Sequence, residues 1–260
     1  MFEFAMNLNY KTFGDGFPLV ILHGLMGSLD NWLSLAKRFS TAYRVWIIDQ
    51  RNHGKSPFSN EFSYHILVND LHDFFEQNGI EKAHIIGHSM GGKVAMDFAA
   101  QYPEMVEKLV VVDVAPVAYD DRHSHIFKAL LAIDLSRVAG REDVETQLHT
   151  LLNGEDERTI QFLMKGLYRN DENNFAWRFN VPVLWKAYNE ISDRVGGSPF
   201  LGQALFIKGQ KSNYITAENF SAIDELFPNN ELEEIANAGH WLHADAPQVF
   251  AEVVERFLQA

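Results

Sequence analysis

Hydrophobic and polar residues follow one another in two recurring patterns along the first half of the chain. Short continuous apolar runs predict strands covered on both faces, whereas apolar residues three or four positions apart predict amphipathic helices. The predicted strands lie at 2–10, 11–13, 18–22, 44–48, around Ile86 and at 107–112, and the predicted helices lie at 30–39, 63–78 and from the glycines after Ser89 to Pro103. Since right-handed crossovers join parallel strands through helices, this alternation predicts an α/β fold with a mostly parallel sheet flanked by helices.

The alternation stops in the middle of the chain and resumes near its end. Between residues 117 and 200 the sequence shows no buried strand run, only helical patterns at 126–138, 143–152, 157–168 and 183–191. Strand and helix patterns then return at 204–207, 217–227, 231–235 and 247–258. We therefore predict a discontinuous core, residues 1–116 and 201–260, and a helical insertion at 117–200.

A serine stands where one predicted strand turns directly into a helix. The apolar run ends in Gly87-His88-Ser89-Met90-Gly91, and the helical pattern begins at once. Small residues on both sides let the backbone turn sharply and hold the serine hydroxyl clear of the sheet, as in a nucleophile elbow. A serine that only caps the helix is the alternative. A dinucleotide-binding loop does not fit, because Ser89 and Met90 stand where it needs glycine.

A serine nucleophile needs a base within hydrogen-bond reach and a third group that orients the base. His240 follows the last predicted strand, which places it at the same edge of the sheet as Ser89. His243, three residues on, is the weaker candidate and is expected near the site without acting as the base. The developing oxyanion needs backbone N–H donors, which we assign to Met90, after the nucleophile, and to Leu25, in a glycine-containing loop after an early strand.

Composition and charge narrow the range of functions. The 260 residues are 47% hydrophobic and 22% charged, with 22 basic against 35 acidic residues, a formal net charge of −13 and no basic cluster. This balance argues against nucleic acid or an anionic membrane as a partner. There is no cysteine, which excludes disulfides, thiolate catalysis and cysteine-ligated metals.

The beginning of the chain has neither a basic segment nor a long apolar segment, so we expect no signal peptide. No apolar run approaches the roughly 18 residues of a membrane span. The sequence therefore indicates a cytoplasmic protein and does not determine its oligomeric state. His123 and His125, with Asp120 and Asp121, lack the spacing of a metal site, and we expect them to be solvated residues, with no metal and no cofactor.

The motifs together resemble the α/β-hydrolase superfamily over the length of the chain. Those that match in order are His23-Gly24, Asp49 with Arg51, Gly54 and Ser56, the Gly87 to Gly91 pentapeptide, and Gly239-His240. The stretches DQRNHGKS, GHSMGG and VVVDVAP resemble the YbfF-type bacterial esterases. The resemblance implies a helical cap over the pocket and hydrolysis of carboxylic esters or acyl thioesters, including acyl-CoA, as small-molecule substrates.

The acid of the expected triad departs from the common family pattern. The loop at 209–216, where the family usually carries it, holds no carboxylate but has Ser212 near the expected position. We assign the acid to Asp113, because it ends the strand that follows the one carrying Ser89. The competing carboxylates are less suitable: Asp49 ends a strand on the far side of the nucleophile, Asp245 is expected to cap the last helix, and Glu218 lies inside a helix. Ser212 is predicted to hydrogen-bond the acid or the base.

The insertion is rich in aromatic residues, which either pack its own core or shape a substrate pocket. We assign Phe127 and Trp185 of the insertion, with Trp241 beside the base, to the pocket.

The sequence thus predicts a serine esterase or thioesterase that forms an acyl-enzyme on Ser89 and needs no cofactor. A cofactor-free perhydrolase or C–C bond hydrolase with the same triad, and a non-catalytic binding module of this fold, stay open as alternatives. Acyl length and leaving group are not given by the sequence.

Overall fold

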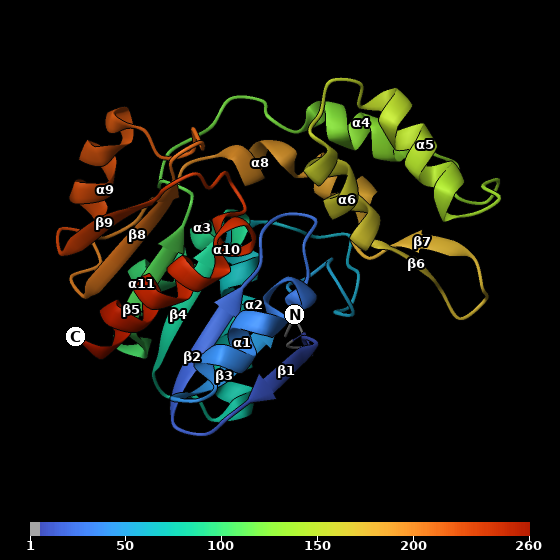
Figure 1. The fold of residues 1–260 in the computed structure, drawn as a ribbon. Coiled ribbons are helices and arrows are strands. Elements are labelled where there is room, and N and C mark those ends of the chain that lie inside the picture. Colours follow the sequence, from blue (N-terminus) through green and yellow to red (C-terminus); the bar gives the residue numbers. More distant parts are fainter. Residues whose placement is uncertain (1–5) are drawn as a thin grey trace.

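A seven-stranded sheet forms the centre of the computed structural model, which describes residues 6–260 (Figure 1). All neighbouring strands run parallel except the first pair, so the predicted mostly parallel α/β fold is confirmed. In spatial order the strands are β1 (Tyr10–Phe13), β3 (Tyr43–Ile48), β2 (Phe17–Leu22), β4 (Ala83–His88), β5 (Val106–Val112), β8 (Gln203–Gly209) and β9 (Asn230–Ile235).

Helices cover both faces of this sheet. The alternation of side chains along a strand separates the two cores: Leu19 and Ile21 of β2 pack with α1 (Leu33–Phe39) and α11 (Pro247–Gln259). Val20 and Leu22 instead belong to the core of α2 (Tyr64–Asn78) and α3 (Met90–Gln101). Because successive residues of a strand point to opposite faces, continuous apolar runs are what a sheet covered on both sides requires.

The register of the parallel strands brings their carboxyl ends to one edge. Leu22 of β2 pairs with Gly87 of β4, and Val112 of β5 pairs with both His88 of β4 and Ile207 of β8. The residues that follow these strand ends therefore emerge side by side, although they are far apart in the sequence.

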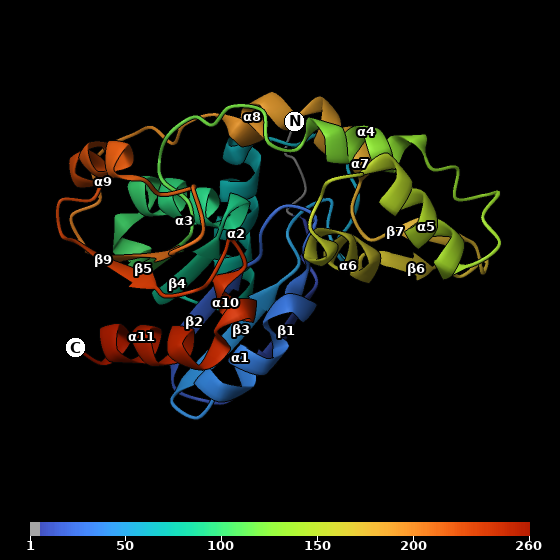
Figure 2. The ribbon, with the colours of Figure 1, turned by 45° about the horizontal axis from the view of Figure 1, so that its top comes forward.

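The segment between β5 and β8 forms a separate layer beside and above this edge (Figures 1 and 2). It contains α4 (Ser124–Ala132), α5 (Arg141–Leu151), α6 (Glu157–Lys165), β6 (Leu167–Arg169), β7 (Phe175–Trp177), α7 (Val181–Lys186) and α8 (Tyr188–Ser192). Its apolar side chains join the core on the α2 and α3 side of the sheet.

Several details differ from the prediction. Residues 167–177 form a short antiparallel hairpin in the insertion, where no strand was predicted, with Asn173 in the left-handed region at its turn. The single helix predicted at 183–191 is two helices that meet at Ala187. The strand predicted at 2–10 lies partly outside the described residues, and from Met6 to Asn9 the chain is not a strand.

Shorter helical elements complete the fold. They are the 3₁₀ helices Leu29–Trp32, Pro103–Met105 and Ala217–Asn219, with α9 (Phe220–Leu226) and α10 (Leu242–Asp245). Ser63 caps α2 by accepting a hydrogen bond from the Ile66 N–H, and Gly79 ends that helix with a φ of 62°, both as predicted. Among residues 6–260, no helix is long and apolar enough to cross a membrane.

Candidate active site

Ser89 occupies a strained turn between β4 and α3. Its φ of 51° and ψ of −118° are unusual for a residue with a side chain. Two close approaches explain the glycines around it. A Cβ on Gly91 would lie 2.5 Å from the His23 carbonyl oxygen, and one on Gly24 would lie 2.7 Å from Nδ1 of His88. Gly91 of the elbow therefore packs against the backbone after β2, and Gly24 packs against the His88 ring, and neither position has room for a side chain.

Asp113 and His240 meet across this edge of the sheet. His240, in the loop after β9, has its Nδ1 2.7 Å from Oδ2 of Asp113, which directly follows β5. Asp113 is fully buried, and its other oxygen accepts a hydrogen bond of 3.0 Å from the Gly209 N–H. Ser212 donates its hydroxyl to the oxygen that faces His240. Because an ionised carboxylate only accepts hydrogen bonds, Nδ1 of His240 carries the proton and Nε2 is the free base.

Tyr214 completes the surroundings of His240 and was not foreseen from the sequence. Its ring stacks on the imidazole with centroids 3.9 Å apart and planes 18° from parallel. Its hydroxyl lies 3.2 Å from Nε2 of His123, and Tyr119 donates to its carbonyl oxygen. The signal available was its place in the loop that also holds Ser212.

The backbone N–H groups assigned to the oxyanion lie next to Ser89. Leu25 and Met90 both border the space at the serine. Within residues 6–260, neither N–H group donates a hydrogen bond. They are therefore available to a ligand.

Two buried histidines fix the loop that carries Leu25. His53 accepts a hydrogen bond of 3.1 Å from the Met26 N–H, and His23 accepts one of 3.0 Å from the Gln50 N–H. Burial lowers the pKa of His23 to about 4 and that of His53 to about 3. Both rings are therefore neutral at pH 7, as an accepting ring nitrogen requires.

Two further histidines lie behind His240. His88 is buried, and its Nε2 lies 2.9 Å from the His240 carbonyl oxygen, so it supports the backbone of the loop. His243 stacks on Trp32 with centroids 4.3 Å apart, and burial lowers its pKa to about 3. No hydrogen bond joins His243 to Asp113, so the structure brings His240, and not His243, to the carboxylate.

A cavity of about 1100 Å³, here called the large cavity, opens at Ser89. It lies between the loop after β2, the loop that follows β9, and helix α6. Of the three aromatic residues expected at the pocket, Trp241 lines this cavity, whereas Phe127 and Trp185 do not. Phe127 is fully buried among cap aromatics, 5.6 Å from Trp185 between ring centroids, and Trp185 borders a separate hollow. Phe127 and Trp185 therefore pack against each other inside the insertion.

Other expected roles also need correction. His123, predicted to be solvated, is half-buried at the large cavity and contacts Tyr214, and burial lowers its pKa to about 4. Asp245 does not cap α11. It accepts a hydrogen bond of 2.8 Å from the Gly239 N–H and pairs with Arg158 of α6. Asp49 accepts hydrogen bonds from Leu29 and Lys55 N–H groups, two strands away from β4.

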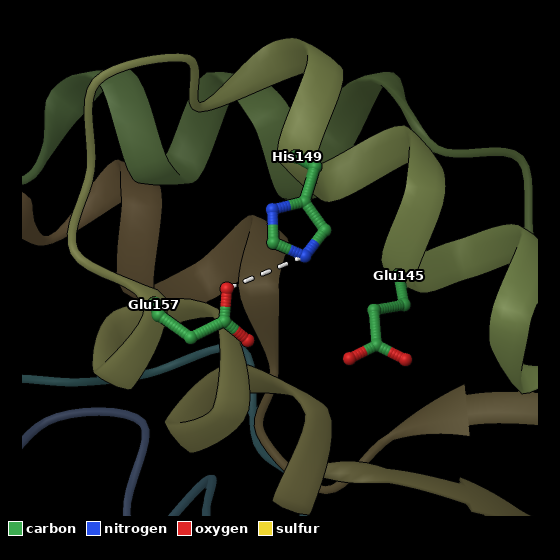
Figure 3. A group of neighbouring side chains, drawn as sticks. All are labelled: Glu145, His149 and Glu157. Atoms are coloured by element: carbon green, nitrogen blue, oxygen red, sulfur yellow. Dashed lines mark ion pairs between the residues drawn. The ribbon is translucent and has the colours of Figure 1, made fainter.

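One group of side chains has the composition of a metal site. Glu145 and His149 of α5 face Glu157 of α6, with ligand atoms within 4.8 Å of one another (Figure 3). His149 and Glu157 are 3.6 Å apart and largely exposed, and Gln161 donates hydrogen bonds to both glutamates. These contacts are those of an ordinary surface ion pair, and none of the three grouped residues lines the large cavity.

This geometry and the comparison with known proteins define the class. The family model described as alpha/beta hydrolase fold matches residues 18–247, and the chain belongs to that family. The chain is 38% identical to Esterase YbfF of Escherichia coli (strain K12) over 93% of this chain and 92% of the relative. It is also 38% identical to the sn-1-specific diacylglycerol lipase ABHD11 of Danio rerio over 98% of this chain and 83% of the relative. A solved structure described as a marine microorganism esterase matches with a TM-score of 0.94 and 40% identity, covering 97% of this chain and 99% of that one.

Because the buried histidines are neutral in the folded protein, we predict that the protein loses stability in mild acid. The unfolded His53, with an ordinary pKa of 6.5, binds a proton that the folded ring refuses down to a pKa of about 3. The contribution of the neutral His53 ring to the free energy of unfolding is therefore fully present above pH 6.5 and is lost as the pH falls below that value. By linkage this amounts to about 2 kcal/mol of the free energy of unfolding between pH 7 and pH 5.

Urea unfolding of the wild type and of His53→Gln at these two pH values measures the effect. The variant should be less stable at pH 7 but lose about 2 kcal/mol less on acidification. An equal loss in both proteins would show that His53 does not resist protonation.

Proposed function

We propose that this protein is a serine esterase that hydrolyses small carboxylic esters through an acyl-enzyme on Ser89. One observation carries the proposal: the buried Asp113 carboxylate lies 2.7 Å from Nδ1 of His240, at the cavity that both Ser89 and His240 line. A serine, a histidine and a carboxylate in this relation generate a nucleophile without any cofactor. The esterases and lipases among the relatives support the same reaction class.

Each residue has a definite role in the proposed reaction. Nε2 of His240 takes the proton as Ser89 Oγ attacks the acyl carbon, and Asp113 stabilises the imidazolium that forms. The oxyanion of the tetrahedral intermediate is held by the Leu25 and Met90 N–H groups. His240 then gives its proton to the departing oxygen or sulfur. Water, activated by the same imidazole, releases the acid.

The first test separates an enzyme from a binding module of the same fold. Ser89→Ala should lower kcat for p-nitrophenyl esters by roughly 10⁶, because it removes the attacking atom. A fluorophosphonate should label the wild type at Ser89 and leave the variant unlabelled. Hydrolysis in the variant within about tenfold of wild type would refute the assignment.

The second test concerns the acid. Asp113→Asn should lower kcat by up to roughly 10⁴, because an amide cannot hold the imidazole with its proton on Nδ1. Ser212→Ala removes only one of the donors to the carboxylate and should cost about 1 kcal/mol, or a factor of about five. Both variants should keep the wild-type circular dichroism spectrum. A larger loss in Ser212→Ala than in Asp113→Asn would move the acid role away from Asp113.

A specific observation also favours thioesters with a negatively charged leaving group, such as acyl-CoA. Of the three carboxylates that line the large cavity, Asp30 pairs with Lys11, Asp245 pairs with Arg158, and Glu155 is hydrogen-bonded to His125. Lys165 and Arg178 also line it, and no carboxylate among the described residues pairs with either. Arg122 lines it as well without a carboxylate partner among the described residues, but its guanidinium donates to Asn213. Lys165 and Arg178, whose side chains donate no hydrogen bond to a described residue, are thus the two cations left to attract phosphate in a protein of net charge −13.

The third test measures this attraction. Replacing both Lys165 and Arg178 by Gln should lower kcat/KM for acetyl-CoA by about tenfold, the effect of about 1.4 kcal/mol of lost attraction. It should leave S-acetyl-N-acetylcysteamine, which has no phosphate, unchanged. Lys37→Gln, at an exposed position of α1, is the control for a lost surface charge. Equal losses on both thioesters would argue against recognition of the phosphates.

A further inference from the structure

Ser89 stands between two cavities of very different size. Besides the large cavity, it borders a space of about 30 Å³, here called the small pocket, lined among others by Tyr64, Lys93, Val114 and Ile191. Ser89 and Leu25 line both spaces. His240 lines the large cavity but not the small pocket. Arg122, His123 and Tyr214 also line both spaces, so the small pocket adjoins the large cavity at Ser89 and differs from it in that His240 does not border it.

The proposed reaction assigns a substituent to each side. The leaving group must face His240, because it receives the proton from Nε2. The oxyanion must face the N–H groups of Leu25 and Met90. The remaining substituent of the tetrahedral carbon, the acyl chain, then extends away from His240. The small pocket is the space at Ser89 that His240 does not border.

We propose that the small pocket is the acyl subsite and that it selects short acyl groups of about two to four carbons, while the large cavity receives a bulky leaving group. This inference rests on the proposed esterase function. About 10–15 Å³ of such space is enough for one water molecule, so a space of about 30 Å³ holds only a few heavy atoms. A long alkyl chain would need the walls of the small pocket to move.

Hydrogen bonds between the two layers fix those walls. Tyr64 of α2 donates its hydroxyl to the Ile191 carbonyl oxygen at 2.9 Å. Lys93 of α3, only 2% exposed, donates from its ammonium group to the carbonyl oxygens of Ser192 and Asp193. Breaking these bonds would leave buried polar groups unpaired, which is costly.

A third wall is held in the same way. Tyr119 donates its hydroxyl to the Tyr214 carbonyl oxygen and accepts from the Ala115 N–H, both at 2.7 Å. The Lys93 ammonium lies 4.9 Å from the centre of the Tyr119 ring. The small pocket is therefore bounded by polar groups that are already paired, and it does not widen to admit a long chain.

The experiment varies the acyl chain at a constant leaving group. With p-nitrophenyl acetate, butanoate and octanoate, kcat/KM of the wild type should fall by about 100-fold from butanoate to octanoate. Ile191→Ala enlarges the small pocket and should raise the ratio of octanoate to acetate by about tenfold. Ile191→Val, which removes a single methyl group, should raise it less and replaces the alanine variant if that does not fold.

A matched control comes from the same layer. Ile126 is 6% exposed and lines only the large cavity, whereas Ile191 is 8% exposed and lines only the small pocket. Ile126→Ala should therefore leave the acyl-length ratio within about twofold of wild type. A wild type that prefers octanoate, or an equal change of the ratio in both alanine variants, would overturn the proposal. Failure of the esterase function itself is distinct, because fluorophosphonate would then not label Ser89.

Discussion

The buried carboxylate of Asp113 is the interaction on which the arrangement of the site depends. A charge without solvent contact is costly unless donors surround it, and here the donors come from three places in the chain. The Gly209 N–H is at the end of β8, the Ser212 hydroxyl is in the loop after β8, and Nδ1 of His240 is in the loop after β9. The backbone of Asp113 is itself tied to β8, because its N–H donates to the Ile207 carbonyl oxygen at 2.8 Å. Satisfying one carboxylate thus fixes the position and the tautomer of the base.

Neutral side chains, in contrast to the charged Asp113, order the loop that carries Leu25. His23 and His53 hold it as neutral rings, each with one nitrogen that accepts from a backbone N–H. Burial keeps the rings neutral, and the neutral rings in turn satisfy buried backbone donors. The negative charge of the site therefore lies on Asp113. The neutral His23 and His53 rings position the backbone and do not compete with His240 for the proton that it must carry.

Much of this could be predicted because it depends on local patterns. The strand and helix around Ser89, the cap and stop of α2, and the place of Asp113 and His240 after their strands all follow from short sequence segments. Contacts between distant segments could not be predicted in the same way. Tyr214 and His240 stack only because two loops meet, and the fully buried Phe127 could not be told from a pocket aromatic by its spacing. Asp245 before Pro247 resembled a helix cap, but Arg158 from another layer pairs with it.

The two sides of Ser89 also differ in how firmly they are held. Helix α6 contacts the His240 loop through the Arg158–Asp245 pair and through Phe162 and Trp241, whose ring centroids are 5.1 Å apart. The Arg158 side chain is 64% exposed, and such pairs typically contribute less than about 1 kcal/mol. The small pocket, in contrast, is bounded by Lys93, whose buried ammonium group is bonded to carbonyl oxygens of the other layer. The contact of α6 with the His240 loop is therefore weaker than the bonds that hold the small pocket's walls, so in the proposed reaction variation in the leaving group is easier to accommodate than variation in the acyl chain.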